Sequence, residues 1–244
     1  MFKIVIPARL KSSRLKNKPL ITIDKLPLII HVLKRCKMSK YASDIIVCAD
    51  DKKIVDIVNK HGGRAVLTSK KFKNGTERIA SVLAKENYKI AVDVQCDEIF
   101  VNPSDIDKLI KFHEQNLHFD IIIPHVDLTK TEHNQNIVKI VHNKFNKILY
   151  LSRANIPYFF RNNKCKLKKH LDFISFKRSA LKKFSKLKKT FNEKIEGVEL
   201  LRALENDFNI GTIKFKNNNF SINTPEDLKR AKKYIKRCKI RKKY

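Results

Sequence analysis

The chain has 244 residues, of which 42% are hydrophobic, and this is enough for one large α/β domain or for a domain with a subdomain. Lysine and arginine number 54 against 24 aspartates and glutamates, and the resulting formal net charge of +30 attracts polyanions in general. The even spread of the basic residues favours the alternative that the charge reflects compositional drift. We expect no membrane span, because no run of about 18 apolar residues occurs, and the five scattered cysteines without a CxxC pair argue against a zinc site or a disulfide framework and for a reducing cytoplasm.

The first half of the chain alternates short apolar runs with segments of helical periodicity. Strands are predicted over 2–8, 43–50, 64–69 and 89–95, and helices over 26–40, 51–63, 75–87 and 103–115. This alternation indicates a parallel sheet with crossover helices, in which ligands bind at the carboxyl ends of the strands. Asn102 and Pro103 suit the cap and the first position of the last of these helices.

After about residue 120 the pattern changes to strands separated by short polar links. The predicted strands cover 119–126, 137–143, 147–152 and 171–177, so we expect a smaller, partly antiparallel region. The basic stretch 161–170 is expected to be a mobile loop, and 195–207 a helix. A last helix over 222–237 starts at Thr224 with Asp227 in a capping box, and we expect its lysine-rich end to be solvated.

The loop after the first strand, "IPARLKSSRLKNKPL" at 6–20, carries five basic side chains and no acid. Arg9, Arg14 and Lys18 could all reach a triphosphate, because guanidinium groups bind phosphate oxygens in pairs and lysine supplies a compact charge. The loop contains no glycine, so it is neither a Walker loop nor a dinucleotide fingerprint. A solvated basic loop is the alternative interpretation.

Two further motifs border predicted strands or helices. "DVQCDEI" places Asp97 and Glu98 at the end of a buried strand, where a carboxylate can hold Mg²⁺ together with substrate phosphates. An acid pair that caps a nearby helix is the alternative. "NGTER" sets Gly75 and Thr76 at a helix start and by itself indicates nothing more. His170 precedes a strand, and a lone histidine there is more typical of a structural or exposed residue.

Together the motifs resemble one family. "IPARLKSSRLKNKPL", "NGTERI", "VQCDEI", "SRANIPYF", "HLDFISFKR" and "INTPEDL" follow the order and spacing of the 3-deoxy-manno-octulosonate cytidylyltransferases over about residues 3–235. The resemblance implies an α/β fold like that of the nucleotide-diphospho-sugar transferases, with a mostly parallel central sheet flanked by helices. It implies one domain over 1–244, with 1–120 binding nucleotide, about 121–215 forming a smaller, partly antiparallel region for sugar binding and dimerisation, and 216–244 returning as a C-terminal helix to the core.

The resemblance also implies an activity. CTP and a 2-keto-3-deoxy sugar acid, by default 3-deoxy-manno-octulosonate (Kdo), would give the CMP-sugar and pyrophosphate for lipopolysaccharide or surface polysaccharide synthesis, in a cytoplasmic homodimer. Phosphate binding is implied for Arg9, Arg14 and Lys18, and other nucleotide contacts for Ala8, Gly75, Thr76, Arg78 and Gln95. Mg²⁺ would bind Asp97, with Asn223 at the second metal position, and the sugar acid would face Arg153 and His170.

Some residues depart from the family pattern on the nucleotide and metal side. Asn17 replaces a glycine in the first loop, and asparagine supplies only part of the backbone freedom of glycine. Cys96 replaces a glycine beside Asp97, where its side chain would crowd the nucleotide. Asn223 replaces an aspartate, which removes a charge, so weaker Mg²⁺ binding is expected.

The residues aligned with the family's sugar-binding positions depart further from the family pattern. Asp172 and Ile174 stand where the family has glycine and tyrosine, and Arg202 and Ala203 align with a polar Glu-Gln pair. Losing polar partners at a site that recognises hydroxyls changes specificity strongly. Alternatives therefore stay open: a cytidylyltransferase for another keto-sugar acid, or a degenerate relative that binds nucleotide without chemistry. A nucleic-acid binder is a third, but the chain has no recognised motif for it and its basic residues are spread, so no specific nucleic-acid partner is expected.

Overall fold

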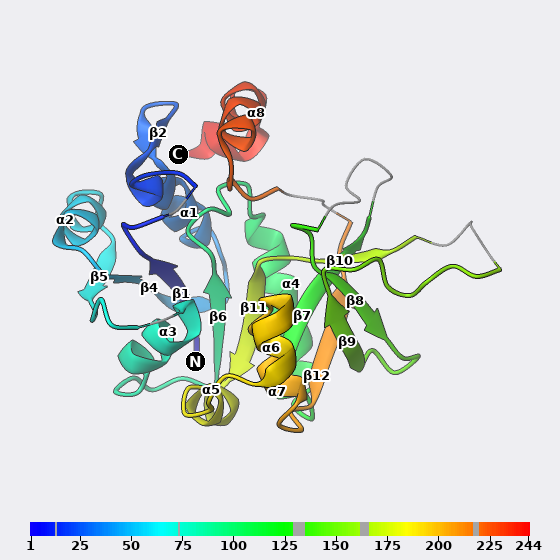
Figure 1. Cartoon of the computed structure of the whole chain (residues 1–244). Helices are drawn as coiled ribbons and strands as arrows, with labels where there is room; N and C mark the ends of the chain where they lie inside the picture. The colour runs from blue at the N-terminus through cyan, green and yellow to red at the C-terminus, as the bar shows by residue number, and fades with distance from the viewer. Residues whose placement is uncertain (13, 73, 129–134, 162–165, 217–219) are drawn as a thin grey trace.

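A mixed sheet, with ten strands in the described part of the chain, runs through the centre of this computed structural model (Figure 1). The structure describes residues 1–12, 14–72, 74–128, 135–161, 166–216 and 220–244. The strand order is β5-β4-β1-β6-β11-β7-β10-β8-β9, and β12 pairs with β7 outside this path. Four neighbouring strands are parallel, so their carboxyl ends meet at one end of the sheet: β5 (Arg64–Leu67), β4 (Ala42–Ala49), β1 (Phe2–Ala8) and β6 (Ile90–Val94).

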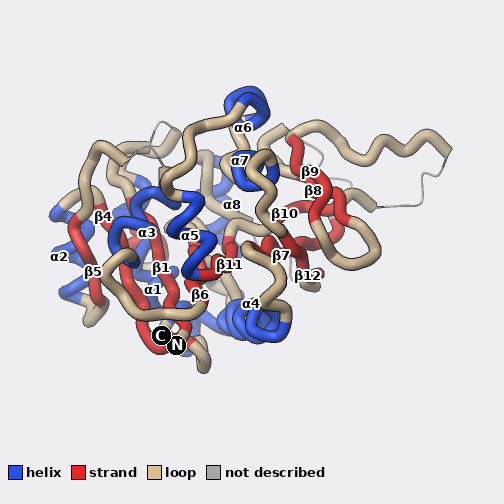
Figure 2. The backbone as a smooth tube through the Cα atoms, turned by 90° about the horizontal axis from the view of Figure 1, so that it is seen from below, coloured by secondary structure: helices blue, strands red, loops and turns tan. Residues whose placement is uncertain are grey.

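Helices cover both faces of the sheet, because successive side chains of a strand point to opposite faces. In β1, Ile4 and Ile6 belong to the core beneath α1 (Leu28–Cys36), α2 (Lys52–Lys60) and α4 (Pro103–Gln115). Val5 belongs to a second core, under α3 (Gly75–Leu83) and α5 (Arg178–Phe184). Figure 2 shows the sheet as a layer between these two groups of helices.

The second half of the chain extends the sheet with antiparallel neighbours. Strand β11 (Phe173–Lys177) runs antiparallel to β6 and to β7 (Ile121–Asp127), and β12 (Ile210–Lys214) is parallel to β7. Beyond β7 lie β10 (Lys168–His170), β8 (Lys139–His142) and β9 (Ile148–Ser152), each antiparallel to its neighbour. The expected α/β class, with a mostly parallel core and a partly antiparallel region, is confirmed.

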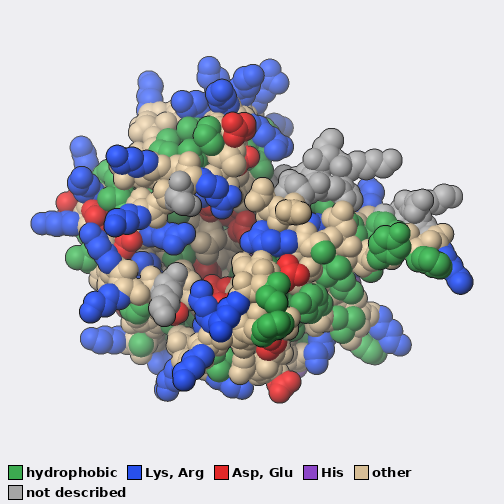
Figure 3. All heavy atoms as spheres, viewed as in Figure 1, with side chains coloured by type: hydrophobic (Ala, Val, Ile, Leu, Met, Phe, Trp, Pro, Cys, Tyr) green, Lys and Arg blue, Asp and Glu red, His purple; other side chains and the backbone are tan. Residues whose placement is uncertain are grey.

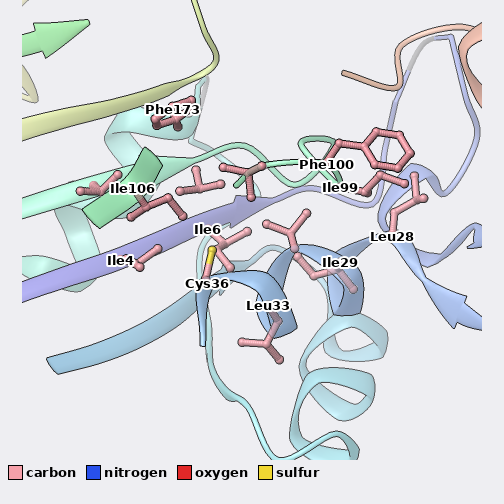
Figure 4. Packing of buried hydrophobic residues seen from close by; sticks show 14 of the residues in the cluster. Ile4, Ile6, Leu28, Ile29, Leu33, Cys36, Ile99, Phe100, Ile106 and Phe173 are labelled. Carbon is pink, nitrogen blue, oxygen red and sulfur yellow. The ribbon is translucent and has the colours of Figure 1, made fainter. Parts of the chain in front are cut away.

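The first core cluster anchors the loop that follows β6. Figure 4 shows Ile99 and Phe100 near Leu28 and Ile29 of α1, and these residues are buried. Close packing of this kind leaves the preceding residues, Asp97 and Glu98, little freedom to move.

Two helix starts agree with the sequence. The Asn102 side chain accepts from Ser104 N at 3.1 Å ahead of Pro103 and α4. Thr224 and Asp227 form the predicted capping box at the start of α8 (Pro225–Ile235). These ends were predictable because a cap depends on residues within four positions of one another.

Two predictions in the second half were wrong. Segment 195–207 is not one helix but α6 (Phe191–Glu196) and α7 (Leu201–Leu204), because Gly197 takes a left-handed conformation with φ 61° that ends α6. The segment 161–170 is not all loop, since 168–170 form β10 between β7 and β8; residues 162–165 lie outside the described residues. Neither α5 nor β12 was predicted.

The basic C-terminal end is not simply solvated. After α8, the short helix η3 (Lys239–Lys243) brings Tyr244 against α1, where its hydroxyl accepts from Arg35 Nε at 3.2 Å. Arg35 also donates to Cys238 Sγ at 2.9 Å, and Arg241 pairs with Asp24 at 2.7 Å. Asp24 lies in the hairpin of β2 (Thr22–Ile23) and β3 (Leu26–Pro27), so the tail packs beside the segment that follows the N-terminal basic loop.

Two bulk expectations can be compared with the described residues. None of their helices has the length and apolar character required to cross a membrane. The described cysteines, Cys36, Cys48, Cys96 and Cys238, are free thiols, and Cys165 lies outside the described residues.

Candidate active site

A cleft of about 330 Å³ opens at the carboxyl ends of β1 and β6. Figure 3 shows this face hollowed near its middle, with Lys and Arg side chains around the hollow and acidic ones inside it. Nine of the twelve residues predicted for the site line the cleft: Ala8, Arg9, Arg14, Lys18, Gly75, Arg78, Gln95, Asp97 and Asn223. Thr76, Arg153 and His170 do not.

The N-terminal loop supplies the positive charge of the cleft. Arg9 and Arg14 are exposed, and within the described residues no ion pair involves either guanidinium, so both can bind an incoming anion. Asn17 adopts a left-handed conformation with φ 52° immediately before the short helix η1 (Lys18–Leu20). Asparagine tolerates this conformation, so replacing glycine here preserves the turn that positions Lys18.

Three segments far apart in the chain meet at the ammonium group of Lys18. Its Nζ forms an ion pair with Asp97 and donates a hydrogen bond to Asn223 Oδ1 at 3.0 Å. The carboxylate and the amide carbonyl thus converge on one cation. These two oxygen donors are of the kind that Mg²⁺ takes in proteins. The residues therefore fit a divalent cation, with one charged protein ligand.

Burial sets the protonation of the acids behind the cleft. Desolvation raises the pKa of Asp97, and the Lys18 ammonium opposes this shift. Desolvation also raises the pKa of Glu98 to about 8, with smaller contributions from the negative charges of Asp172 and Asp97. Such acids gain most from a cation that restores their charge.

At the end of β6, Gln95 presents an uncharged amide group to the cleft. Gln95 Nε2 donates to both carboxylate oxygens of Asp93, at 2.9 and 3.0 Å, so the amide group of Gln95 is held in one orientation at the cleft. Gly75 starts α3 against β1: a Cβ there would lie 3.2 Å from Pro7 Cγ and 3.8 Å from Gln95 Nε2. Glycine thus permits the close approach that narrows the cleft.

Two residues that were expected to contact the nucleotide, Arg78 and Thr76, contact other residues of the chain. Arg78 is buried and donates a hydrogen bond to the Thr68 hydroxyl, and its Nη2 lies 3.8 Å from Asp50 Oδ2. The second carboxylate oxygen of Asp50, Oδ1, accepts a hydrogen bond from Leu10 N at 2.8 Å. Arg78 therefore fixes the start of the N-terminal loop while lining the cleft. Thr76 is buried near Glu199 and does not line the cleft.

The two residues expected at the sugar lie further along the sheet. Arg153, after β9, donates from Nε to the Glu196 carbonyl at 2.7 Å and from Nη2 to the Gly197 carbonyl at 3.3 Å. His170, at the end of β10, lies 3.3 Å from Asp172 through Nε2. Arg153 thus holds the end of α6 against β9, and only His170 directly adjoins the acids behind the cleft.

The substitutions expected to change the sugar site at 202–203 do not reach it. Arg202 is 1% exposed and forms two hydrogen bonds with Glu193, at 2.8 and 2.7 Å, while its guanidinium lies 4.9 Å from the ring of Phe184. Ala203 is fully buried. Both are structural, and the prediction that they alter a polar sugar contact was wrong because burial cannot be inferred from an alignment of single residues.

Sequence reasoning missed three residues around the acids, Asp93, Glu199 and Ser221, and it named Asp172 only as a departure from the family pattern. Asp93 carried a signal, as a charge within an otherwise apolar strand, and its pKa is raised, first of all by burial. The Glu199 side chain is 28% exposed, desolvation raises its pKa to about 7, and its Oε1 has no hydrogen-bond partner among the described residues. The contact between Asp172 and Ser221 carried no local signal, because the two residues meet only in the fold.

Comparisons with known proteins agree on one family. A family model described as cytidylyltransferase matches residues 3–210. The 3-deoxy-manno-octulosonate cytidylyltransferase of Chloroherpeton thalassium is 35% identical over 235 residues, covering 94% of this chain and 95% of the relative. That of Rickettsia felis is 37% identical, covering 95% and 94%. A structure of CMP:2-keto-3-deoxy-manno-octonic acid synthetase complexed with CTP superposes with a TM-score of 0.93 at 29% identity, covering 97% of this chain and 98% of the other.

Proposed function

Because the chain belongs to the cytidylyltransferase family, we propose that it transfers the CMP group of CTP to 3-deoxy-manno-octulosonate. The relatives named above carry this sugar acid and CTP in their names, and they match this chain over nearly its full length. The observation that carries the proposal is the meeting of Lys18, Asp97 and Asn223 in a cleft that Arg9 and Arg14 border.

The reaction is a displacement at phosphorus. The anomeric hydroxyl oxygen of the sugar acid forms a bond to the α-phosphorus of CTP, and the bond from that phosphorus to the bridging oxygen breaks. Pyrophosphate leaves with the electron pair. The protein aligns attacker and leaving group and neutralises charge, and the guanidinium groups of Arg9 and Arg14 suit the departing pyrophosphate.

A divalent cation completes the site in this proposal. Asp97 and Asn223 would hold Mg²⁺, which supplies positive charge to the phosphate oxygens and favours loss of the hydroxyl proton. Lys18 has a second task, since its ammonium can turn from Asp97 toward the phosphates when the cation arrives. Residues 1–120 would bind nucleotide, about 121–215 the sugar acid, and the reaction would take place in the cytoplasm, where the free thiols are stable.

We also propose a homodimer formed by the region around β9. The outermost strand of the sheet, β9, exposes Leu149 and Tyr150, and α6 exposes Phe191 and Ile195 to 71% and 67%. Ser152 of β9 bonds to Glu196 of α6, so the two elements are adjacent. An edge strand beside exposed apolar side chains is typical of a protein interface.

A pyrophosphate assay tests the proposed reaction. Purified protein is mixed with CTP, Mg²⁺ and Kdo, and pyrophosphate release and the mass of CMP-Kdo are measured. ATP, GTP and UTP serve as nucleotide controls, and Lys18→Met as the protein control. Turnover with CTP and Kdo supports the proposal. Turnover with a different keto-sugar acid alone favours the alternative suggested by Ile174, and nucleotide binding without any turnover would leave a degenerate relative.

A further inference from the structure

Asp172 lies between β10 and β11, and its carboxylate faces two parts of the candidate site. Oδ1 lies 3.3 Å from His170 Nε2, and Oδ2 lies 2.9 Å from Ser221 Oγ. The backbone carbonyl of Asp172 also accepts from Gln95 N at 3.3 Å. Asp172 thus connects His170, which is expected to contact the sugar acid, with the segment before α8 and with the end of β6.

The contacts of His170 fix its ring. Nδ1 lies 3.0 Å from the Leu171 carbonyl oxygen, and Nε2 faces the Asp172 carboxylate. Each ring nitrogen thus faces an oxygen atom, and the two contacts together hold the orientation of the ring. The His170 side chain is 12% exposed, whereas that of Asp172 is 43% exposed. The ring is therefore enclosed, and the more exposed carboxylate orients it.

The other oxygen of Asp172 reaches the metal side. Ser221 bonds to Asp172 and also to Glu98, and the next residue, Ile222, donates from its backbone to the Asp97 carbonyl at 3.3 Å. Asn223 follows directly. Asp172 is therefore connected through Ser221 to the segment that carries the candidate metal ligand.

The chain has a carboxylate at 172 and none at 223, whereas the family pattern has glycine and aspartate at these positions. We propose that Asp172 is a positioning residue for the sugar acid, which holds the His170 imidazole in one orientation and links it to the Ser221–Asn223 segment. The inference rests on the proposed function, because it takes His170 as a contact of the sugar acid.

Kinetics with two variants at 172 test this role. Asp172→Ala removes both contacts, and we expect the KM for Kdo to rise about threefold to tenfold, the range for one lost hydrogen bond. Asp172→Asn keeps an acceptor toward His170 and is expected to retain most of the affinity. The KM for CTP should stay within about twofold in both variants. Asp56→Ala, on the exposed face of α2, is the control for loss of a carboxylate elsewhere.

A double-mutant cycle separates positioning from a direct contact with substrate. In a His170→Ala background, Asp172→Ala should add nothing to the KM for Kdo, because the histidine it orients is absent. An equal rise of KM with and without His170, or an Asp172→Asn variant as impaired as Asp172→Ala, would overturn the inference. Thermal unfolding of each variant identifies a loss of folding, which would shift all kinetic parameters together.

A readout without turnover keeps this inference separate from the proposed function. In protein labelled with ¹⁵N-histidine, the ring resonances of His170 are assigned from the His170→Ala spectrum. Asp172→Ala should shift these resonances and leave those of the other histidines in place, and Asp56→Ala should leave all of them unchanged. If wild-type protein fails to turn over Kdo, the proposed function fails while this spectrum still decides the contact. Unmoved His170 resonances would refute it.

Discussion

The buried pair of Arg202 and Glu193 offers the sharpest test of how this fold is held together. Glu193→Gln keeps the size of the side chain but removes the negative charge that two of the three hydrogen bonds of Arg202 engage; the third goes to the Leu187 carbonyl oxygen. Arg202 is 1% exposed and Glu193 5%, so water cannot replace the lost partner. Breaking a buried ion pair on one side costs about 3–5 kcal/mol.

That cost can be converted into a shift of the melting temperature. For a chain of this length, 1 kcal/mol corresponds to about 2–4 °C, so we expect Glu193→Gln to lower Tm by roughly 6–20 °C. The assay is thermal and urea unfolding followed by circular dichroism. Glu114→Gln is the matched control, because the Lys89–Glu114 pair is 3.5 Å apart with both side chains more than 40% exposed, and an exposed pair contributes about 1 kcal/mol or less. A Tm within about 2 °C of wild type, or a raised KM for the sugar acid at unchanged Tm, would refute a structural role for Arg202.

Four other predictions concern the site, the pH dependence and the assembly. Asn223→Asp adds a second carboxylate beside Asp97 and should lower the Mg²⁺ concentration that gives half-maximal rate about tenfold. This concentration is measured by titrating the metal in the pyrophosphate assay. If it is unchanged, residue 223 is not a metal ligand. Lys18→Met should reduce kcat by about 10²–10³ while circular dichroism stays native, because a charge that stabilises the transition state is lost; a wild-type kcat would remove Lys18 from the reaction. Burial lowers the pKa of His113 to about 4, so the unfolded chain takes up a proton between about pH 6.5 and 4, and stability falls as the pH falls through this window. In His113→Gln, the slope of the unfolding free energy against pH should be smaller by about 1.4 kcal/mol per pH unit. Urea titrations at several pH values measure this slope. Ile195→Glu should convert the dimer into monomers in sedimentation experiments, and a wild-type protein that is itself monomeric would contradict the proposed assembly.

The elements of the first half of the chain were largely predictable because their signals are local. The predicted helix 103–115 matches α4 in full, since Asn102 caps it and Pro103 occupies its first position. The motifs that follow β1 and β6 were expected at one end of a parallel sheet, and the structure brings Ala8 and Gln95 together there. Gly75 of α3 lines the same cleft and was expected there only through the family resemblance. Alternation of strands and helices fixes such a topology almost by itself.

Features that depend on contacts across the fold were not predictable. Gly197 ends α6 within a run whose periodicity indicates one helix, because hydrophobic spacing does not reveal a left-handed residue. Arg202 was placed at the sugar site, whereas its partner Glu193 buries it. The contact between Asp172 and Ser221 joins residues 49 positions apart, and neither belongs to a motif that requires the other.

The place of the Lys18 ammonium between Asp97 and Asn223 has a consequence for the order in which ligands enter. A divalent ion that takes this position replaces one positive charge by two, so it adds a single charge at that position and displaces the ammonium group. With the cleft empty, that displaced group gains only water. With a triphosphate present it gains phosphate oxygens, so metal and nucleotide should each strengthen the binding of the other.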